Sequence, residues 1–399
     1  MGHVLSRPLC IKVIERCRSK FVSFVSSEMQ GLRLTMEDEG VFTTCLHPEH
    51  FPNVHVDAVF DGHGGNMAST YLRNNFLKTL AKMNNPFDSI ELTNVFEKMD
   101  VKFHLKHPQD LSGSTICGYI FCPIRSILLS FNVGDSRMVL FDETNGKIIF
   151  ETVDHKPNLP NEHKRILAAG GFVENKRVSG QLALSRAFGD WQFKNKTNLK
   201  LHEQMVIVRP DCKLFTTINP NTSMLVCCDG IVDHLTNKEV VDYIVKSLKQ
   251  QQQQSKRKLA TTNILANIQE LSLKSGSSDN MTIHLSQTGV FDPIAFTLSV
   301  LDLNTSDSIN KDEDRVQNDD GKWTNARKQY LDRIEKIANR HDLDTSQLMK
   351  HANLSSTHQK GPHKKIIQKE KKDDENWDEF PTAKAWMPSS MNKTQNGCC

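Results

Sequence analysis

The chain has 399 residues, enough for one large domain with an appendage or for two domains. Its 38% hydrophobic and 24% charged residues are ordinary for a globular protein, and its net charge of +3 is too small to indicate nucleic-acid binding. No stretch approaches the roughly 18 apolar residues of a membrane span, and the first residues do not resemble a secretory signal peptide. The 10 cysteines form no CxxC pair, which favours free thiols in a reducing compartment. We therefore expect an intracellular protein of the cytoplasm, with the nucleus left open and no nucleic-acid partner.

The first 22 residues form a basic, partly apolar leader. Its start, MGHVLS, fits the pattern M-G-x-x-x-[ST] and predicts N-myristoylation of Gly2. One myristoyl chain binds membranes only weakly, so a second signal is needed. Cys10 and Cys17 are candidate palmitoylation sites, and several Arg and Lys side chains between positions 7 and 20 suit anionic lipid. The leader thus predicts partial membrane association.

The segment VHVDAVFDGHGG at 54–65 predicts a strand that ends at Asp61 in a glycine-rich turn. A carboxylate at a rigid strand end, with the Gly62 carbonyl free beside it, suits a hard cation that prefers oxygen ligands. His63 is adjacent and can act as an acid or a base. The Asp-Gly pair after apolar residues is equally typical of a plain hairpin turn, so this segment alone leaves both interpretations open.

The same design recurs along the chain, and the recurrence favours a metal centre. Acids stand at predicted strand ends or turns in the segments 36–38, 127–135, 154–157, 224–230 and 278–285. No Cys or His spacing fits zinc, and no EF-hand loop is present. Ligation by oxygen alone indicates Mg²⁺ or Mn²⁺.

Short strands alternate with a few helical patterns between these turns. Residues 68–83 carry an apolar stripe at helical spacing, and residues 162–169 end at a Gly-Gly pair typical of a helix C-cap. Residues 237–273 are helical with a glutamine-rich interruption. Many short strands with few helices predict an α+β fold, a two-sheet antiparallel β-sandwich flanked by helices.

The composition changes after this region. We predict an acidic linker over 293–320, a helical extension over 321–350, and a polar, disordered tail over 351–399. The extension has apolar residues at three- and four-residue spacing: Trp323, Ala326, Tyr330, Ile334, Ile337 and Ala338. We expect this stripe to pack on the main domain, with a partner-binding face as the alternative. The terminal Cys398-Cys399 pair resembles the prenylated ends of some small GTPases, and chance explains it equally well.

Taken in order, the acidic segments and their neighbours resemble the protein phosphatase 2C family. The matching segments are GLRLTMED at 31–38, FDGHGG at 60–65, SGST at 112–115, NVGDSR at 132–137, DHKP at 154–157, RVSGQLALSRAFGD at 177–190, CDG at 228–230 and SDNM at 278–281. The resemblance predicts a catalytic domain over 23–292, with the family's sandwich and a metal cleft at one end of it. Gly40 and Val232 depart from the family, which usually has histidine and tryptophan there. Neither position is a metal ligand in the family, so these departures bear on packing beside the site.

The resemblance implies a metal-dependent hydrolase acting on phosphoserine and phosphothreonine in proteins. One Mg²⁺ or Mn²⁺ would be held by Glu37, Asp61 and Gly62, and a second by Asp61, Asp229 and Asp279. Asp154 would join Asp229 at a third position found in some members. A water activated by two metals would attack the phosphoryl group, with Arg33 binding phosphate and His63 protonating the leaving oxygen. The alternatives for these last two are a surface arginine and a structural histidine.

Other residues near these motifs carry weaker signals. Asp38 is either an outer orienter of bound water or a turn cap, and Asp135 and Asp190 are expected to cap turns. Nothing indicates a serine nucleophile at Ser114. A catalytically dead scaffold is disfavoured because every expected ligand is present, and a metallonuclease because basic patches with aromatics are missing near the motifs. We expect a monomer.

Overall fold

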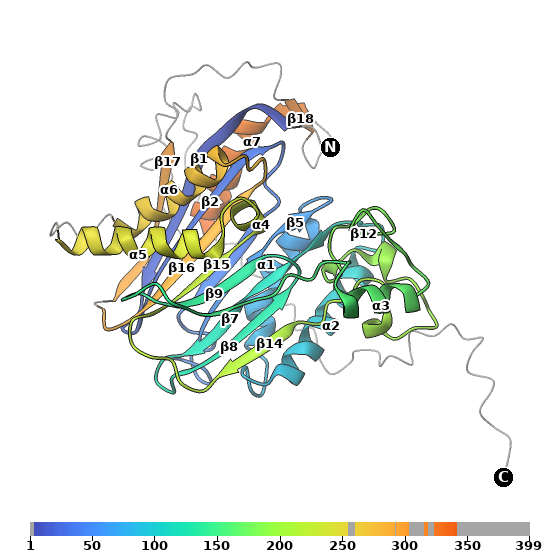
Figure 1. Ribbon diagram of the computed structural model, residues 1–399, viewed down its shortest axis with the longest axis horizontal. Coiled ribbons are helices and arrows are strands. Elements are labelled where there is room, and N and C mark those ends of the chain that lie inside the picture. Colours follow the sequence, from blue (N-terminus) through green and yellow to red (C-terminus); the bar gives the residue numbers. More distant parts are fainter. Residues whose placement is uncertain (1–3, 254–259, 292, 303–314, 318–322, 341–399) are drawn as a thin grey trace, which may run out of the picture.

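Two antiparallel sheets stacked face to face form the centre of the molecule (Figure 1). The computed structural model describes residues 4–253, 260–291, 293–302, 315–317 and 323–340. The larger sheet has the order β10-β9-β15-β16-β2-β1-β17 and the smaller one β14-β8-β7-β4-β3. The strands of the larger sheet are β1 Val4–Arg18, β2 Val22–Arg33, β9 Arg137–Asp142, β10 Ile148–Glu151, β15 Thr222–Cys227, β16 Met281–Thr288 and β17 Ile294–Asp302. Those of the smaller sheet are β3 Glu39–Thr43, β4 His55–Phe60, β7 Ile116–Cys122, β8 Ile127–Val133 and β14 Asp211–Phe215.

Helices cover the outer faces of both sheets, so that strands such as β4 and β7 are buried along their whole length. α1 Met67–Leu80 and α2 Ser89–Lys106 pack on the smaller sheet, and α5 Asn237–Gln253 and α6 Ala260–Lys274 on the larger (Figure 1). A separate cluster, with Tyr119 and Met224 among its members, fills the space between the sheets. The predicted α+β two-sheet sandwich flanked by helices is confirmed.

Shorter elements complete the chain at the ends of the sheets. They are β5 Gly62–His63, β6 Gly113–Ser114, β11 Val173–Glu174, β12 Arg177–Val178, β13 Phe188–Gly189, β18 Arg315–Gln317, β19 Trp323–Asn325, the helices α3 Pro160–Ala168, α4 Asp229–Val232 and α7 Ala326–Arg340, and two 3₁₀ turns at Trp191–Phe193 and Leu201–Glu203. β13, β6 and β5 form a three-stranded sheet, which joins the glycine-rich turn after β4 to the segment near residue 190. This small sheet brings parts of the candidate site together.

The predicted basic leader is a strand of the larger sheet. β1 pairs with β2 on one side and with β17 on the other. Ile11 and Val13 face α7, whereas Cys10 and Ile14 pack on the α5–α6 side. Cys10 is only 5% exposed within this core, so its thiol is not accessible on the surface described, and its palmitoylation stays a prediction. Gly2 lies outside the described residues.

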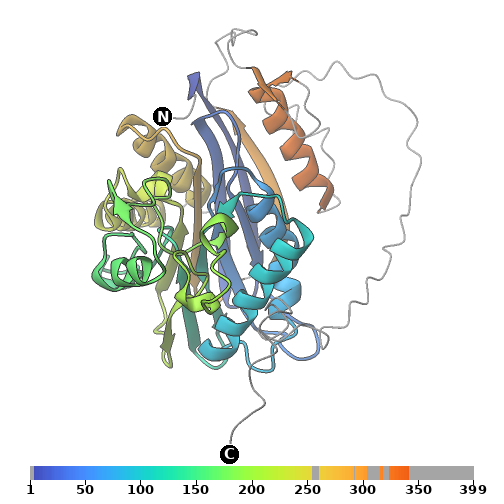
Figure 2. The ribbon, with the colours of Figure 1, turned by 90° about the vertical axis from the view of Figure 1, so that its right-hand side faces the viewer.

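The C-terminal extension packs on the sandwich. Ile294–Asp302, part of the predicted linker, is a strand because it pairs with β1. Figure 2 shows α7 in orange beside the larger sheet. Its buried residues Tyr330, Ile334, Ile337 and Ala338 contact β1, so the predicted packing face is confirmed for them. The side chains of Trp323 and Ala326 and the whole of 341–399, including the predicted tail, lie outside what the structure describes.

The structure also shows the state of the cysteines and whether any described helix could span a membrane. In the described ranges the cysteines at positions 10, 17, 45, 117, 122, 212, 227 and 228 are all free thiols. No helix within those same ranges combines the length and the apolar character that crossing a membrane requires.

Candidate metal centre

The predicted site acids meet at one end of the sandwich because of the strand register. Met281 at the start of β16 pairs with Met29 near the end of β2, and β15 ends opposite Ile283. In the other sheet, Glu39 at the start of β3 pairs with Phe60 at the end of β4. The turns that leave or enter these strands, which carry the acids, therefore converge.

Asp61 lies at the centre of these acids. Its carboxylate, with those of Asp135 and Asp229, forms a group whose ligand atoms lie within 4.8 Å of one another. A second such group joins Asp61 to Asp38 and the Cys228 thiol. Burial, together with the neighbouring carboxylates, raises the pKa values of Asp61 and Asp229 well above the usual range, and burial raises the pKa of Asp38 to about 7. Such a concentration of carboxylates fits a hard divalent cation, which would favour their charged forms.

Glu37 is fixed beside Asp61 by residues that the sequence did not single out. Its backbone N–H donates to Asn280 Oδ1 at 2.8 Å, and the Ser69 hydroxyl donates to its carbonyl at 2.6 Å. The Glu37 carboxylate accepts the Gly65 N–H at 3.1 Å. A Cβ on Gly62 would overlap the Glu37 carbonyl oxygen, so only glycine allows the turn to approach this closely.

Arg33 stands at the rim of the site. Its Nη2 lies 2.5 Å from Asp279 Oδ2, and its side chain is 50% exposed. Although burial alone would lower its pKa, the charges of Asp279, Asp61 and Asp229 raise it. The guanidinium is thus anchored to the acids while half of it faces solvent, where it can bind an incoming anion.

His63 has a buried carboxylate partner. Its Nε2 lies 2.7 Å from Asp190 Oδ2, and Asp190 is 2% exposed with a left-handed φ of 53°. The contact passes over Gly113, where a Cβ would collide with both groups. Burial lowers the His63 pKa, but the charge and hydrogen bond of Asp190 outweigh it and raise the pKa. The prediction of Asp190 as a plain turn cap missed this role, because the two residues are far apart in sequence.

Two further acids differ from expectation. Asp154, implied as a third-metal ligand, accepts two hydrogen bonds from Arg137, at 2.8 and 3.0 Å. It belongs to neither acid group found among the described residues. Asp135, expected to cap a turn, instead lies beside Asp61 and Asp229, where it also accepts a hydrogen bond from Lys156.

The backbone around Asp61 is held by Thr115. The Asp61 N–H donates to Thr115 Oγ1 at 3.0 Å, and the Thr115 N–H donates back to the Asp61 carbonyl at 2.9 Å. Ser114 is fully buried, and its hydroxyl donates to the Thr115 carbonyl. Its environment gives no sign of a nucleophilic serine.

The two departures from the family pattern have packing explanations. A Cβ on Gly40 would lie 2.6 Å from Cε1 and 2.7 Å from Nε2 of His284, so the glycine makes room for that ring. His284 is buried and pairs with Asp57 at 2.6 Å. Val232 is 5% exposed and lies in the core under α5 and α6.

A family model described as "Protein phosphatase 2C" matches residues 22–281. The chain belongs to the protein phosphatase 2C family. It is 34% identical over 268 residues to "Protein phosphatase 2C 1" of Paramecium tetraurelia, a match that covers 63% of this chain and 87% of that protein. It is also 34% identical over 258 residues to "Protein phosphatase 2C homolog 2" of Saccharomyces cerevisiae, covering 63% of this chain. This chain spans about half, 55%, of the length of the yeast protein.

Solved structures agree with this family membership. A phosphatase from Toxoplasma gondii superposes with a TM-score of 0.62 at 28% identity, covering 73% of this chain and 99% of that one. A sex determining protein of Caenorhabditis elegans, at 22% identity and a TM-score of 0.56, shares the fold, with 67% of this chain and 65% of that chain covered. As a protein phosphatase 2C, the chain is a serine/threonine protein phosphatase of a family that is in general metal-dependent.

Proposed function

We propose that this phosphatase works with two Mg²⁺ or Mn²⁺ ions centred on Asp61. Glu37, Asp61 and the Gly62 carbonyl would hold one ion, and Asp61, Asp229 and Asp279 the other. The observation that carries the proposal is the position of Asp61, which belongs to both acid groups of the site and is half-buried between them. Bound there, two such ions would activate a water and neutralise phosphoryl charge. A third ion at Asp154 would have to share that carboxylate with Arg137, so two ions fit better.

Arg33 and His63 would supply the remaining chemistry. The half-exposed Arg33 guanidinium presents a planar fork toward solvent, which suits two oxygens of a phosphoryl group. His63, whose protonated form is stabilised by Asp190, would deliver a proton to the seryl or threonyl oxygen as the ester bond breaks. Its 29% exposure leaves the ring accessible to a bound substrate.

A phosphopeptide assay with a matched variant tests the two-ion proposal. Wild-type protein should release phosphate from phosphoseryl and phosphothreonyl peptides with millimolar Mn²⁺ or Mg²⁺, and should be inactive in excess chelator. Asp61→Asn should abolish turnover, whereas Asp242→Asn, at a 55% exposed acid on α5, should leave it unchanged. Full turnover in excess chelator would rule out the metal mechanism.

We also propose partial membrane association through an acylated Gly2, supported by the sequence pattern alone. The palmitoylation candidates lend no support: Cys10 is buried, and burial foremost, with the charges of Glu15 and Asp57, raises the pKa of Cys17 to about 12. Polybasic attraction would then be the second signal. Fractionation should show wild-type protein partly with membranes and Gly2→Ala released from them. Two proteins that are both fully unbound would contradict the proposal.

We likewise propose that the protein is a monomer. Light scattering of the purified protein should give the mass of a single chain.

A further inference from the structure

α7 reaches the acidic segment of the site from outside the part of the chain that matches the family. The matched segment ends at residue 281, and α7 begins at Ala326. Arg333 of α7 donates from Nη1 to Glu39 Oε1 at 2.9 Å, and from Nη2 to Glu28 Oε2 at 2.8 Å and to the Asp38 carbonyl at 2.7 Å. One guanidinium therefore joins β2 to the segment that directly follows Glu37.

The helix is held in place by apolar packing and one further hydrogen bond. Ile334 and Ile337 are buried against β1, and Met36, the neighbour of Glu37, lies in the same cluster. The Tyr330 hydroxyl donates to the Glu28 carbonyl at 3.1 Å. Arg333 itself is only 15% exposed, so its contacts are screened little by water.

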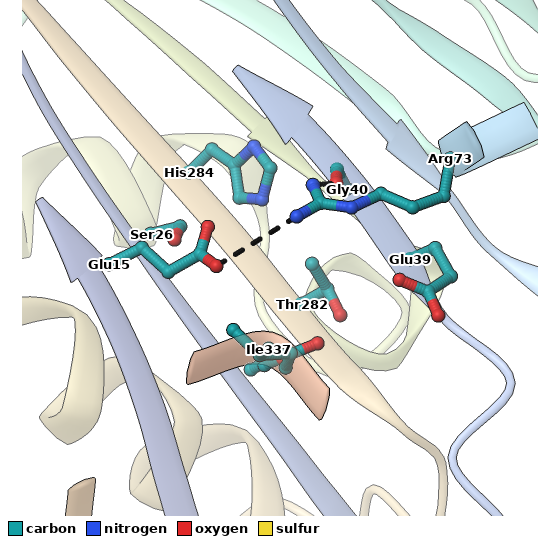
Figure 3. A pocket seen from close by; sticks show the side chains of 9 residues that line it. Glu15, Ser26, Glu39, Gly40, Arg73, Thr282, His284 and Ile337 are labelled. Carbon is teal, nitrogen blue, oxygen red and sulfur yellow. Dashed lines mark hydrogen bonds and ion pairs between the residues drawn. The ribbon is translucent and has the colours of Figure 1, made fainter. Parts of the chain in front are cut away.

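A small polar cavity lies where α7 meets the sandwich (Figure 3). Its volume is about 20 Å³, room for about one water, and its lining includes Glu28, Glu39 and Ile337. On another side of the cavity, Arg73 of α1 donates to the Gly40 carbonyl and lies 4.0 Å from Glu15 (Figure 3). Two guanidinium groups, one from α1 and one from α7, thus hold the backbone carbonyls on either side of Glu39.

We propose that Arg333 is a positioning residue for the metal centre, so that the C-terminal extension is a working part of the active site. The proposal rests on the two-ion function proposed above. Without Arg333, the carboxylates of Glu28, 14% exposed, and Glu39, 7% exposed, lose their shared cation, and the Asp38 carbonyl loses a donor. Their mutual repulsion would be relieved by movement of the 38–39 backbone, which displaces Glu37 from Asp61 and weakens metal binding.

Calorimetric titration of metal-free, full-length protein with Mn²⁺ separates positioning from simple helix docking. Arg333→Met keeps the apolar stem but removes the guanidinium, and we expect Mn²⁺ to bind about 10-fold more weakly. Arg333→Lys keeps the charge but cannot span three acceptors, so it should recover only part of the affinity. Lys336→Ala, at an exposed residue of the same helix, is the matched control and should bind like wild type.

Ile334→Ala is the packing control. It removes buried methyl groups from α7 and should lower the melting temperature at least as much as Arg333→Met, yet change Mn²⁺ affinity less than about 2-fold. Wild-type affinity in both Arg333 variants, or equal weakening in Ile334→Ala, would show that α7 acts only by packing and would overturn the inference. If wild-type protein binds no Mn²⁺, the two-ion function fails first and this inference falls with it; wild-type binding that Asp61→Asn abolishes keeps the two questions apart.

Discussion

Glu162 offers a quantitative test of how this structure holds the segment that leads to the His63–Asp190 pair, the proposed general acid and its partner. The carboxylate is 3% exposed on α3 and accepts hydrogen bonds from Arg165 at 2.6 Å, Arg186 at 2.7 Å and the Ser185 hydroxyl at 2.7 Å. Ser185 and Arg186, which these bonds hold in place, lie a few residues before Asp190, the partner of His63. We therefore expect Glu162→Gln to reduce both stability and turnover.

The magnitude follows from the Glu162 pKa. Burial alone would raise it, but the Arg186 hydrogen bond and the charges of Arg165 and Arg186 lower it from 4.5 to about 2. Since a tenfold change in proton affinity is worth about 1.4 kcal/mol, the ionised form is stabilised by about 3 kcal/mol. Glu162→Gln should lower the free energy of unfolding at pH 7 by about that amount, in line with the roughly 3–5 kcal/mol lost when one partner of a buried ion pair is removed.

The contribution of Glu162 to the free energy of unfolding should depend on pH. Because the folded pKa of Glu162 lies below the unfolded one, its contribution is fully present above pH 4.5 and disappears as the pH falls toward 2. At pH 3.5 about 1.4 kcal/mol of it should be gone, so the gap between wild type and Glu162→Gln should roughly halve. Urea unfolding at pH 7, 4.5 and 3.5 measures this gap. Glu174→Gln, at an exposed acid on nearby β11, serves as the control. A gap that is under 1 kcal/mol at pH 7, or that does not change with pH, would refute the reasoning.

Three further predictions concern the site. His63→Gln should lower kcat on seryl phosphates by roughly 10²–10⁴ but far less on phenyl phosphates, whose leaving group needs no proton; equal losses in the two kinetic assays would remove the acid role. Asp190→Asn removes the charge that raises the His63 pKa, so the high-pH limb of the kcat profile should move to lower pH, and an unmoved limb would count against the pairing. Gly40→His should destabilise the fold by about 1–3 kcal/mol in thermal unfolding because the new ring meets His284. Gly40→Ala, whose Cβ alone would lie 2.6 Å from Cε1 of His284, should lose part of the same stability, and wild-type stability in Gly40→Ala would exclude this steric explanation.

The acids proposed as metal ligands were predictable because of where strands end. Asp61 and Asp229 follow strongly apolar strands, Asp279 precedes an alternating one, and antiparallel pairing fixes which strand ends meet. Asp135 has the same sequence signature, yet only the structure shows it beside Asp229 rather than at a turn alone. The sequence indicates where a strand ends, but the tertiary structure determines which side chains face one another there.

The partners that position the site could not be predicted in the same way. His63 and Asp190 meet through β5, β6 and β13, strands of two residues that are too short to show any periodicity. Asn280 lies within a recognised motif, but its bond to the Glu37 backbone spans 243 residues and leaves no local trace. Such contacts are a property of tertiary structure.

The composition of β1 did not indicate that this segment is a strand of the larger sheet. Its basic residues suggested a leader that attracts anionic lipid, yet Lys12 is fully buried and its Nζ lies 2.5 Å from Glu270 of α6. A charged residue inside a strand becomes compatible with burial only when a distant partner neutralises it. The helix α2 shows the opposite case, a helix that the sequence indicates and that we did not predict. Asp88 caps its start, and its buried residues recur at helical spacing: Leu92, Phe96, Met99 and Phe103.

If the C-terminal extension positions the site as proposed, the recognisable motifs do not by themselves define the active enzyme. A chain cut after residue 288 would retain every motif of the family, since the matched segment ends at 281. It would lose β17, which leaves the outer edge of β1 without hydrogen-bond partners. It would also lose Arg333, the cation that Glu28 and Glu39 share, two residues from Glu37. Under the role proposed for Arg333, the position of Glu37 depends on a helix almost 300 residues further along the chain.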